Sequence, residues 1–222
     1  MSVSGLYPKL LDDDGEDLFD AEKISEDADT VPDFVTGRDS RESAKRGIAT
    51  HMLLQFCDLS SLKENGAKSE LDRLVACGFI SKKDKERVRL SEVELFRNSR
   101  LLSDMLSAKQ IYRELRFNVR LPASEFTQDP ERVADYADST VLVQGVIDCI
   151  IEDEHGHLHL VDYKTDRLTQ EELEDREKAR ARLSAAHSLQ LSYYARAAQI
   201  MFGKRPVSVE VYSLPLGDTV PV

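Results

Sequence analysis

The stretch TVLVQGVIDCIIEDEHGHLHLVDYKT, residues 140–165, predicts a β-hairpin at the centre of the fold. Its first half is β-branched and apolar, EHG is a turn signal, and the second half returns as a strand. Strand side chains alternate between the two faces of a sheet, so Asp162 and Lys164 point to one face and Tyr163 to the other. Taken alone, an acid and a lysine at this spacing are equally typical of a weak ion pair at a solvated strand end.

The length of the hairpin loop decides which residues face each other. With residues 154–156 as a three-residue loop, Asp148 lies opposite Asp162, where Cβ atoms are roughly 5 Å apart and like charges destabilise the strand pair. A divalent cation offsets that repulsion, and carboxylates are ligands that Mg²⁺ and Mn²⁺ prefer. With a two-residue loop at His155 and Gly156 the register shifts by one, and the acids point to opposite faces. We favour the first register, which predicts a metal site.

Lys164 shares the face of this predicted metal site. An ammonium group beside a bound cation is unfavourable unless an anion lies between the two. A phosphate, or the hydroxide that attacks one, is an anion of this kind. The lysine therefore favours chemistry on a phosphate ester.

Helices are expected before and after the hairpin. Residues 40–59, SRESAKRGIATHMLLQFCDL, have the 3.6-residue apolar period of an amphipathic helix and carry His51. The later segment HSLQLSYYARAAQIMFG (187–203) is a helix closed by its final glycine, with Gln190 and Tyr194 four apart on one side. Further helices are predicted for SELDRLVACGF (69–79), for two or three segments within 81–106, and for the charged TQEELEDREKARARL (169–183).

Two more segments alternate as strands. QIYRELRFNVRLP (110–122) contains Glu114 and ends at a proline, and RPVSVEVYSLP (205–215) alternates three valines. No phosphate-binding loop of the GxxxxGK[ST] type occurs, so this sequence predicts no ATP hydrolysis of its own.

The charge of the chain is concentrated near its start. Of the formal net charge of −11, almost all lies between Asp12 and Glu42, which hold 13 acidic and 3 basic residues. We expect residues 1–40 to be an acidic, flexible arm and residues 41–222 to form one domain. The nearly neutral remainder keeps a nucleic-acid partner open.

Cysteine use and hydropathy bear on the compartment. The three cysteines, Cys57, Cys77 and Cys149, are widely spaced, which fits neither a disulfide framework nor a zinc or iron–sulfur site. No apolar run is long enough for a transmembrane helix, and the N-terminus lacks a signal-peptide pattern. We expect a cytoplasmic protein with reduced thiols and no membrane partner.

Five separated motifs together resemble the RecB-like branch of the PD-(D/E)xK nuclease superfamily. They are RGIATH with His51, RELRF with Glu114, GVID with Asp148, VDYKT with Asp162 and Lys164, and QLSYY with Gln190 and Tyr194. They occur in the family's order and cover about residues 35–215. Within this branch the pattern is most similar to the nuclease domains of the AddA family, in which such a domain follows a helicase that is absent here. The acidic arm would then be the remnant of an interdomain linker.

The resemblance implies a role for each matching residue. His51, Asp148 and Asp162 match the metal ligands, with the backbone carbonyl of Tyr163 as a further donor, and Lys164 matches the catalytic lysine. Two further matches are less direct: Glu114 corresponds to an acid that supports catalysis, and Gln190 with Tyr194 to residues that orient the site or bind the substrate strand. The implied cofactor is Mg²⁺, and an imidazole ligand predicts that Mn²⁺ is tolerated.

The implied fold is α/β: a restriction-endonuclease-like mixed central sheet flanked by helices, with a helical N-terminal part. The implied activity is a metal-dependent DNA exonuclease of recombination and repair. It would act on single-stranded DNA together with a helicase domain and an AddB-like partner subunit. The main alternative is a DNA-binding or scaffolding module that keeps the fold without the chemistry, which the complete set of acids and lysine disfavours. A stand-alone exonuclease of the Cas4-like type often carries a four-cysteine cluster, which three scattered cysteines cannot supply.

Overall fold

The computed structural model describes residues 38–126 and 139–222. Most of the expected acidic arm, residues 1–37, therefore lies outside the described residues, and helix α3 begins at Arg38. None of the helices in the described part of the chain has the length and apolar character needed to cross a bilayer. All three cysteines are free thiols, as expected.

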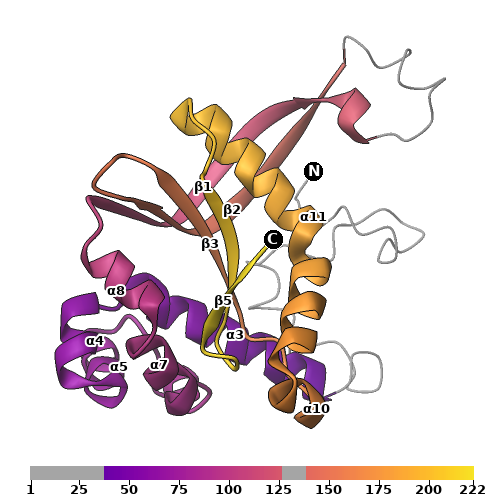
Figure 1. Cartoon of the computed structure of the whole chain (residues 1–222). Helices are drawn as coiled ribbons and strands as arrows, with labels where there is room; N and C mark the ends of the chain where they lie inside the picture. Colours follow the sequence, from indigo (N-terminus) through magenta and orange to yellow (C-terminus); the bar gives the residue numbers. More distant parts are fainter. Residues whose placement is uncertain (1–37, 127–138) are drawn as a thin grey trace.

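A mixed sheet of five strands forms the centre of the described molecule, in the order β1-β2-β3-β4-β5 (Figure 1). The strands are β1 (Gln110–Pro122), β2 (Thr140–Glu152), β3 (Leu158–Lys164), β4 (Ser208–Ser213) and β5 (Asp218–Pro221). The β3–β4 pair is parallel, and the other three pairs are antiparallel. The predicted α/β class and the four predicted strands are confirmed. The short edge strand β5 was not expected from the sequence.

The hairpin between β2 and β3 has the three-residue loop and the predicted register. Cys149 pairs with Val161 and Glu152 with Leu158, and the Asp153 N–H donates to the His157 carbonyl at 3.0 Å. Continuing this register by one position sets Asp148 opposite Asp162. The alternative register, which would have put the two acids on opposite faces, is excluded.

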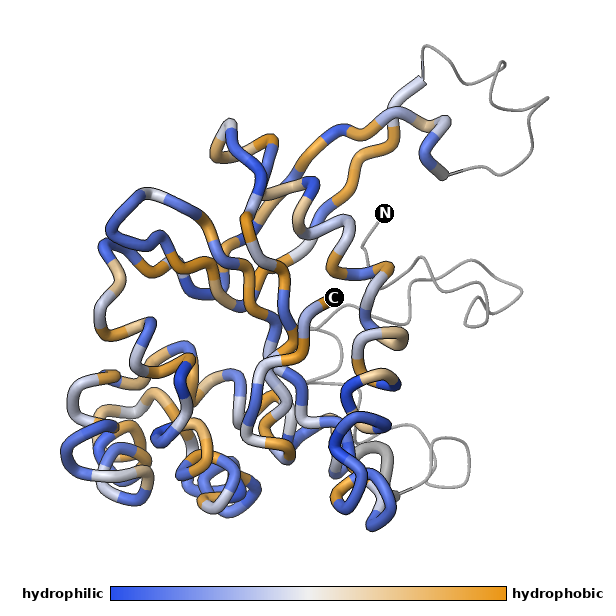
Figure 2. The backbone as a smooth tube through the Cα atoms, in the orientation of Figure 1, coloured by the Kyte–Doolittle hydropathy of each residue, from blue (hydrophilic) through white to orange (hydrophobic). Residues whose placement is uncertain are grey.

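Six helices from the first described range lie on one side of the sheet (Figure 1). They are α3 (Arg38–Phe56), α4 (Leu59–Asn65), α5 (Ala67–Ala76), α6 (Lys82–Lys85), α7 (Leu90–Arg97) and α8 (Arg100–Leu106). Their apolar sides form one core with the sheet, in which Leu53 and Phe96 pack with Tyr163 and Tyr212. Figure 2 shows this division, with hydrophilic outer turns around an apolar interior. The predicted helical N-terminal part is confirmed.

The other side of the sheet is covered by a helical connection between the parallel strands β3 and β4. A short helix, α10 (Gln170–Glu174), starts with a capping box of Thr169 and Glu172. The helical segment is interrupted at Asp175, and α11 then runs continuously from Arg176 to Phe202. The break predicted from the sequence, near residues 184–186, is wrong. The Asp175 side chain accepts from the Lys178 N–H and caps a new helix, whereas residues 184–186, Ser-Ala-Ala, favour continuation.

In β1 and β2, the regular alternation of side chains between the two faces of the sheet is interrupted at the same level of both strands. Tyr112 and Leu115, three residues apart, both pack on the α11 side, and so do Ile147 and Ile150. A regular strand would send residues three apart to opposite sides. Glu114, between the first two, has φ 51°, a left-handed backbone that is unusual for a residue with a side chain. This irregularity marks the row where the acidic residues lie.

Gly145 leaves room for two aromatic rings behind that row. A Cβ at this position would lie 2.8 Å from Phe117 Cζ and 3.5 Å from Tyr194 Cε1. The two rings meet edge to face, with centroids 5.6 Å apart. Gly145 therefore allows β2 to approach α11 closely enough to bury Tyr194, which is 7% exposed.

We expect Gly145→Ala to lower the free energy of unfolding by about 1–3 kcal/mol, because the added methyl overlaps an aromatic ring that is held on both sides. Urea denaturation measures the change. Phe117→Leu removes the obstructing ring atoms, so the double variant should lose less stability than the sum of the two single variants. Additive losses would show that the Phe117 contact is not the reason for the glycine.

Candidate active site

Three carboxylates occupy one row across three neighbouring strands. The β1–β2 register pairs Arg113 with Cys149 and Leu115 with Ile147, which sets Glu114 beside Asp148. The β2–β3 register continues the row to Asp162. Asp148 is 8% exposed and Asp162 only 2% exposed, and Glu114 is half-buried. Three like charges at this spacing repel one another, so the row needs positive partners.

His51 brings one such partner from α3. Its Nδ1 lies 3.4 Å from Asp148 Oδ1 and 4.0 Å from Glu114 Oε1. One ligand atom from each of these three side chains can be chosen so that all lie within 4.8 Å of one another. The histidine ring also packs edge-on against Tyr163, with centroids 6.2 Å apart. Helix α3 therefore brings His51 to the carboxylate row, and its predicted role as a metal ligand stays a prediction.

A backbone hydrogen bond fixes Asp148. The N–H of Tyr163 donates to Asp148 Oδ2 at 2.7 Å, at the position where the regular β2–β3 pairing ends. The Tyr163 ring is anchored in the core below, where it contacts Phe96 and its hydroxyl lies 3.8 Å from Met105 Sδ. Asp148 thus has one oxygen committed to the strand and the other directed to His51. The predicted role of the Tyr163 carbonyl as a metal donor stays a prediction.

The side chains of the site have shifted acidities. Burial alone would lower the pKa of His51, but the Asp148 carboxylate outweighs it and raises that pKa to about 9. Burial, followed by the charge of Asp148, raises the pKa of Glu114 to about 7. The same two causes raise the pKa of Asp162. His51 therefore holds its proton more strongly than a free imidazole, and Glu114 and Asp162 hold protons more strongly than free carboxylates.

Lys164 is held between an acid and an amide. Its Nζ lies 2.7 Å from Asp162 Oδ2 and donates to Gln190 Oε1 at 3.0 Å. The Gln190 amide in turn donates to the Tyr194 hydroxyl at 2.9 Å. Burial disfavours the ammonium form, but Asp162 outweighs it and raises the pKa of Lys164. Gln190 and Tyr194, one helical turn apart on α11, thus orient the lysine; the prediction that they contact the substrate stays a prediction.

Two further contacts around Lys164 were missed in the sequence. His187 Nε2 on α11 lies 3.4 Å from Asp166 Oδ1, two residues after the lysine. Arg46 on α3 donates to the Thr165 carbonyl at 2.9 Å. Together these contacts hold the segment that follows β3 between the two helical layers. The available signal was the spacing of His187 and Gln190, which are three apart and therefore share a helix side.

The donors present fit a divalent cation. Carboxylate oxygens and one imidazole make a set that Mn²⁺ accepts readily and Mg²⁺ accepts mainly through its oxygens. Asp162 Oδ2 is buried, and in the described structure its close partner is the Lys164 ammonium at 2.7 Å. Carboxylates at this spacing repel one another, and a bound cation would offset that repulsion. His51, Glu114 and Asp148 therefore suit a divalent cation, and Asp162 lies beside this group, where its role as a metal ligand stays a prediction.

Comparison with known proteins agrees with this site. The family model of the PD-(D/E)XK nuclease superfamily matches residues 26–218. The chain is 28% identical over 209 residues to an ATP-dependent helicase/nuclease subunit of Thermoanaerobacter sp. (strain X514), covering 93% of this chain and 16% of that protein. The protein of the same name in Ruminiclostridium cellulolyticum is 30% identical over 189 residues, or 85% of this chain and 14% of that protein. That of Heliobacterium modesticaldum is 34% identical over 172 residues, or 77% and 12%.

The match to the family model and the matches to the curated relatives cover very different shares of the proteins compared. The chain spans less than a fifth of the length of these curated relatives, so their names describe much larger proteins. The family model, in contrast, extends over most of this chain and includes every residue of the carboxylate row, His51 and Lys164. The chain belongs to the PD-(D/E)XK nuclease superfamily.

Proposed function

We propose that the chain is a metal-dependent nuclease that hydrolyses phosphodiester bonds in DNA. The observation that carries this proposal is the convergence of His51, Glu114 and Asp148 on one point, with Asp162 and Lys164 beside them. A group of ligands with an adjacent ammonium is what hydrolysis of an anionic ester requires. Superfamily membership supports the same chemistry.

The residues divide the work between binding and charge stabilisation. His51, Asp148 and Asp162 hold the metal, with Glu114 and the Tyr163 carbonyl as supporting donors. The metal, Mg²⁺ or Mn²⁺, supplies Lewis acidity towards the scissile phosphate and lowers the pKa of a bound water. Lys164 donates hydrogen bonds to the attacking water or to a phosphate oxygen, and its charge offsets the charge that builds up during attack. Gln190 orients the Lys164 ammonium towards the scissile phosphate, because the Gln190 amide is itself held by its hydrogen bond to the Tyr194 hydroxyl.

The relatives suggest the larger setting. Proteins named as subunits of an ATP-dependent helicase/nuclease contain a segment similar to this chain. We infer that the chain acts as the nuclease part of a helicase–nuclease of recombination and repair, in the cytoplasm, with an AddB-like partner subunit. A strand unwound by a helicase is single-stranded and has an end, which favours exonuclease action on single-stranded DNA.

A scaffolding module of the same fold is the alternative. Such a module would have no reason to keep three repelling carboxylates in one row, or a buried lysine held by the Gln190 amide. Both features are costly for stability alone and useful for catalysis. We therefore favour the enzyme.

With Mg²⁺ or Mn²⁺, the chain is expected to degrade linear single-stranded DNA and to leave it intact in chelator. Gel assays on end-labelled linear DNA and on circular single-stranded DNA separate the modes, because an exonuclease needs an end. Cleavage of the circle would replace the exonuclease by an endonuclease. Tight Mn²⁺ binding without cleavage of any substrate would favour the scaffolding module.

Lys164→Met is expected to abolish cleavage but to bind Mn²⁺ at least as tightly as the wild type, because it removes a positive charge that competes for Asp162. Without metal it should lose about 3 kcal/mol of stability, because Asp162 is then buried without a partner. Calorimetric Mn²⁺ titration and thermal melting measure both. Lys109→Met, which breaks only the exposed 3.4 Å pair with Glu152, is the control and should change neither. Loss of Mn²⁺ binding in Lys164→Met would make the lysine part of the metal site.

The pH dependence should have opposite signs with and without metal. A folded-state pKa of His51 near 9, above about 6.5 in the unfolded chain, gives stability that is complete below about pH 6.5 and is lost as the pH rises towards 9. A ligating imidazole must be neutral, so the stabilisation that Mn²⁺ adds should instead grow over the same range. Melting temperatures in chelator and in Mn²⁺ measure both slopes. His51→Asn should flatten both, and two parallel slopes would contradict a ligand role for His51.

A further inference from the structure

The outer halves of β1 and β2 form a two-stranded ribbon that extends beyond the rest of the sheet (Figure 1). We define the ribbon as residues 115–122 of β1 and 140–147 of β2, which pair from Leu115 with Ile147 to Pro122 with Thr140. The β2–β3 ladder includes only residues 149–152 of β2, so among the described strands the ribbon pairs with nothing else. It begins directly at the carboxylate row.

The two sides of the ribbon differ in polarity. One side packs against α11 through apolar residues that belong to one core: Phe117, Val119, Leu121 and Val143. The other side, which we call the open face, presents four exposed polar residues: Arg116, Asn118, Arg120 and Gln144. It also carries the apolar Leu142 opposite Arg120 and Val146 opposite Arg116. Asn118 and Gln144 face each other across the two strands, and the two arginines lie on either side of Asn118 along β1.

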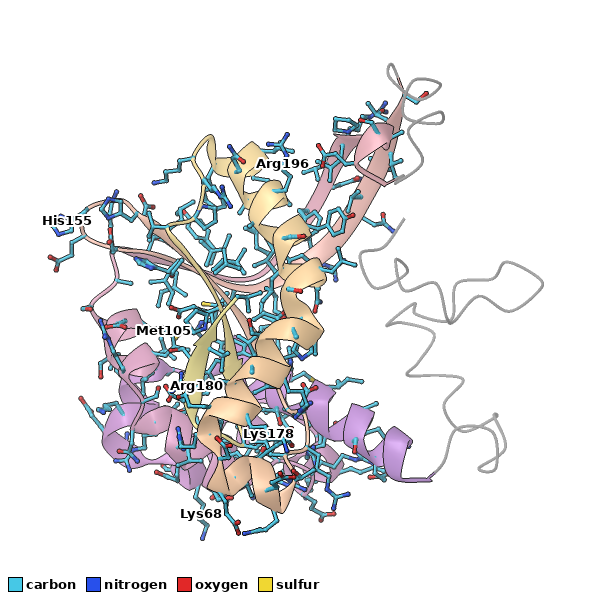
Figure 3. All side chains as sticks on the ribbon, turned by 45° about the vertical axis from the view of Figure 1, so that its right-hand side comes forward. Lys68, Met105, His155, Lys178, Arg180 and Arg196 are labelled. Carbon is cyan, nitrogen blue, oxygen red and sulfur yellow. The ribbon has the colours of Figure 1, made fainter. Side chains whose placement is uncertain are left out.

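The two arginines of the open face are among the minority of described basic side chains without an ion pair, although the charge of Arg116 acts on Glu114. Most basic side chains of the described residues are ion-paired, including the basic run at the start of α11, where Arg176 and Arg180 contact Asp218 and Lys178 contacts Glu171. Figure 3 shows Lys178 and Arg180 at one end of α11 and Arg196 at the other. Arg196 lies 3.9 Å from Glu125. In the described structure, neither Arg116 nor Arg120 has an ion pair or hydrogen bond.

We propose that the open face binds the phosphate backbone of a single DNA strand and leads it to the carboxylate row. This inference rests on the proposed nuclease function and deepens it. Arginine is the side chain best suited to phosphate, and amides such as Asn118 and Gln144 hydrogen-bond to phosphate, sugar or base edges. Two guanidinium groups four strand residues apart, roughly 14 Å, meet different phosphates of the same strand. Their charge complements the substrate in a chain that is otherwise acidic.

The recessed acids favour a single strand over a duplex. Asp148 and Asp162 are almost fully buried at the base of the ribbon, so the scissile phosphate must reach into the site. A flexible single strand can bend into this position, whereas a duplex must be deformed at an energetic cost. Arg116 lies two residues from Glu114 on β1 and is therefore the contact nearest to the point of cleavage.

The test measures binding without catalysis. Anisotropy of a short fluorescein-labelled oligothymidylate is recorded in chelator over a range of salt concentrations, with the wild-type chain and with Arg116→Gln/Arg120→Gln. Each lost phosphate contact reduces the slope of log K against log salt by about 0.7, so the double variant should lose about 1.4 in slope and bind on the order of 25-fold more weakly at about 0.1 M salt. With Mn²⁺, its KM should rise while kcat at saturating DNA stays within about twofold.

The control is Lys82→Gln/Lys83→Gln, which removes the same charge from α6, where neither lysine has an ion pair in the described structure. It should keep the wild-type slope. Asn118→Glu is a second variant that adds a negative charge to the open face without removing a cation, and it should also weaken binding. Because all these side chains are exposed, the variants should melt at the wild-type temperature.

Each outcome separates this inference from the proposed function. If Arg116→Gln/Arg120→Gln and Asn118→Glu bind DNA as tightly as the wild type, the DNA strand does not run over the open face. This conclusion holds even if the wild-type chain cleaves DNA. An equal loss in the lysine control, or tighter binding of duplex than of single-stranded DNA, also overturns the proposal. A wild type that binds through the open face but cleaves nothing with any metal contradicts the nuclease function and leaves the path intact. A wild type without measurable DNA binding overturns the path.

Discussion

The carboxylates of Glu114, Asp148 and Asp162 repel one another, and other parts of the fold must supply the positive partners that offset this repulsion. Each acid is brought to the row by strand register, and none can leave it without breaking the sheet. The fold offsets the charge from three directions: the Tyr163 N–H from within the sheet, His51 from α3, and Lys164 from β3 itself. The two helical layers therefore serve the same small region from opposite sides.

The sequence predicted most of the row because its determinants are local. A three-residue loop sets the β2–β3 register, and the side-chain period of two then places Asp148 and Asp162 without further information. The helix with His51 and the helix with Gln190 and Tyr194 were recognised from apolar period and motif order. The contacts of these two helices depend on packing between segments far apart in the chain. Only the resemblance to a known family indicated those contacts.

The parts that were missed have a shared physical cause. The left-handed Glu114 sits where two strands change sides together, and no residue type in RELRF signals it, since glutamate is not favoured in that conformation. The break at Asp175 depends on a side-chain cap that competes with a strong helical propensity on both sides. Strand β5 is only four residues long and is defined by its partner β4 rather than by its own pattern. These are tertiary effects that override weak local preferences.

The parallel pairing of β3 with β4 has a consequence for the order in which the protein assembles. The strands β1, β2 and β3 are neighbours in both sequence and sheet, so the carboxylate row belongs to contacts of short separation. Gln190, which accepts from Lys164, and Tyr194, which holds Gln190, lie on α11. This helix belongs to the long crossover that must dock before β4 can pair with β3. Contacts across such a crossover carry a larger loop-closure cost and form late. During synthesis or refolding, we therefore expect the acidic row to form before Lys164 is fixed, so that the candidate site is complete only once the crossover has docked.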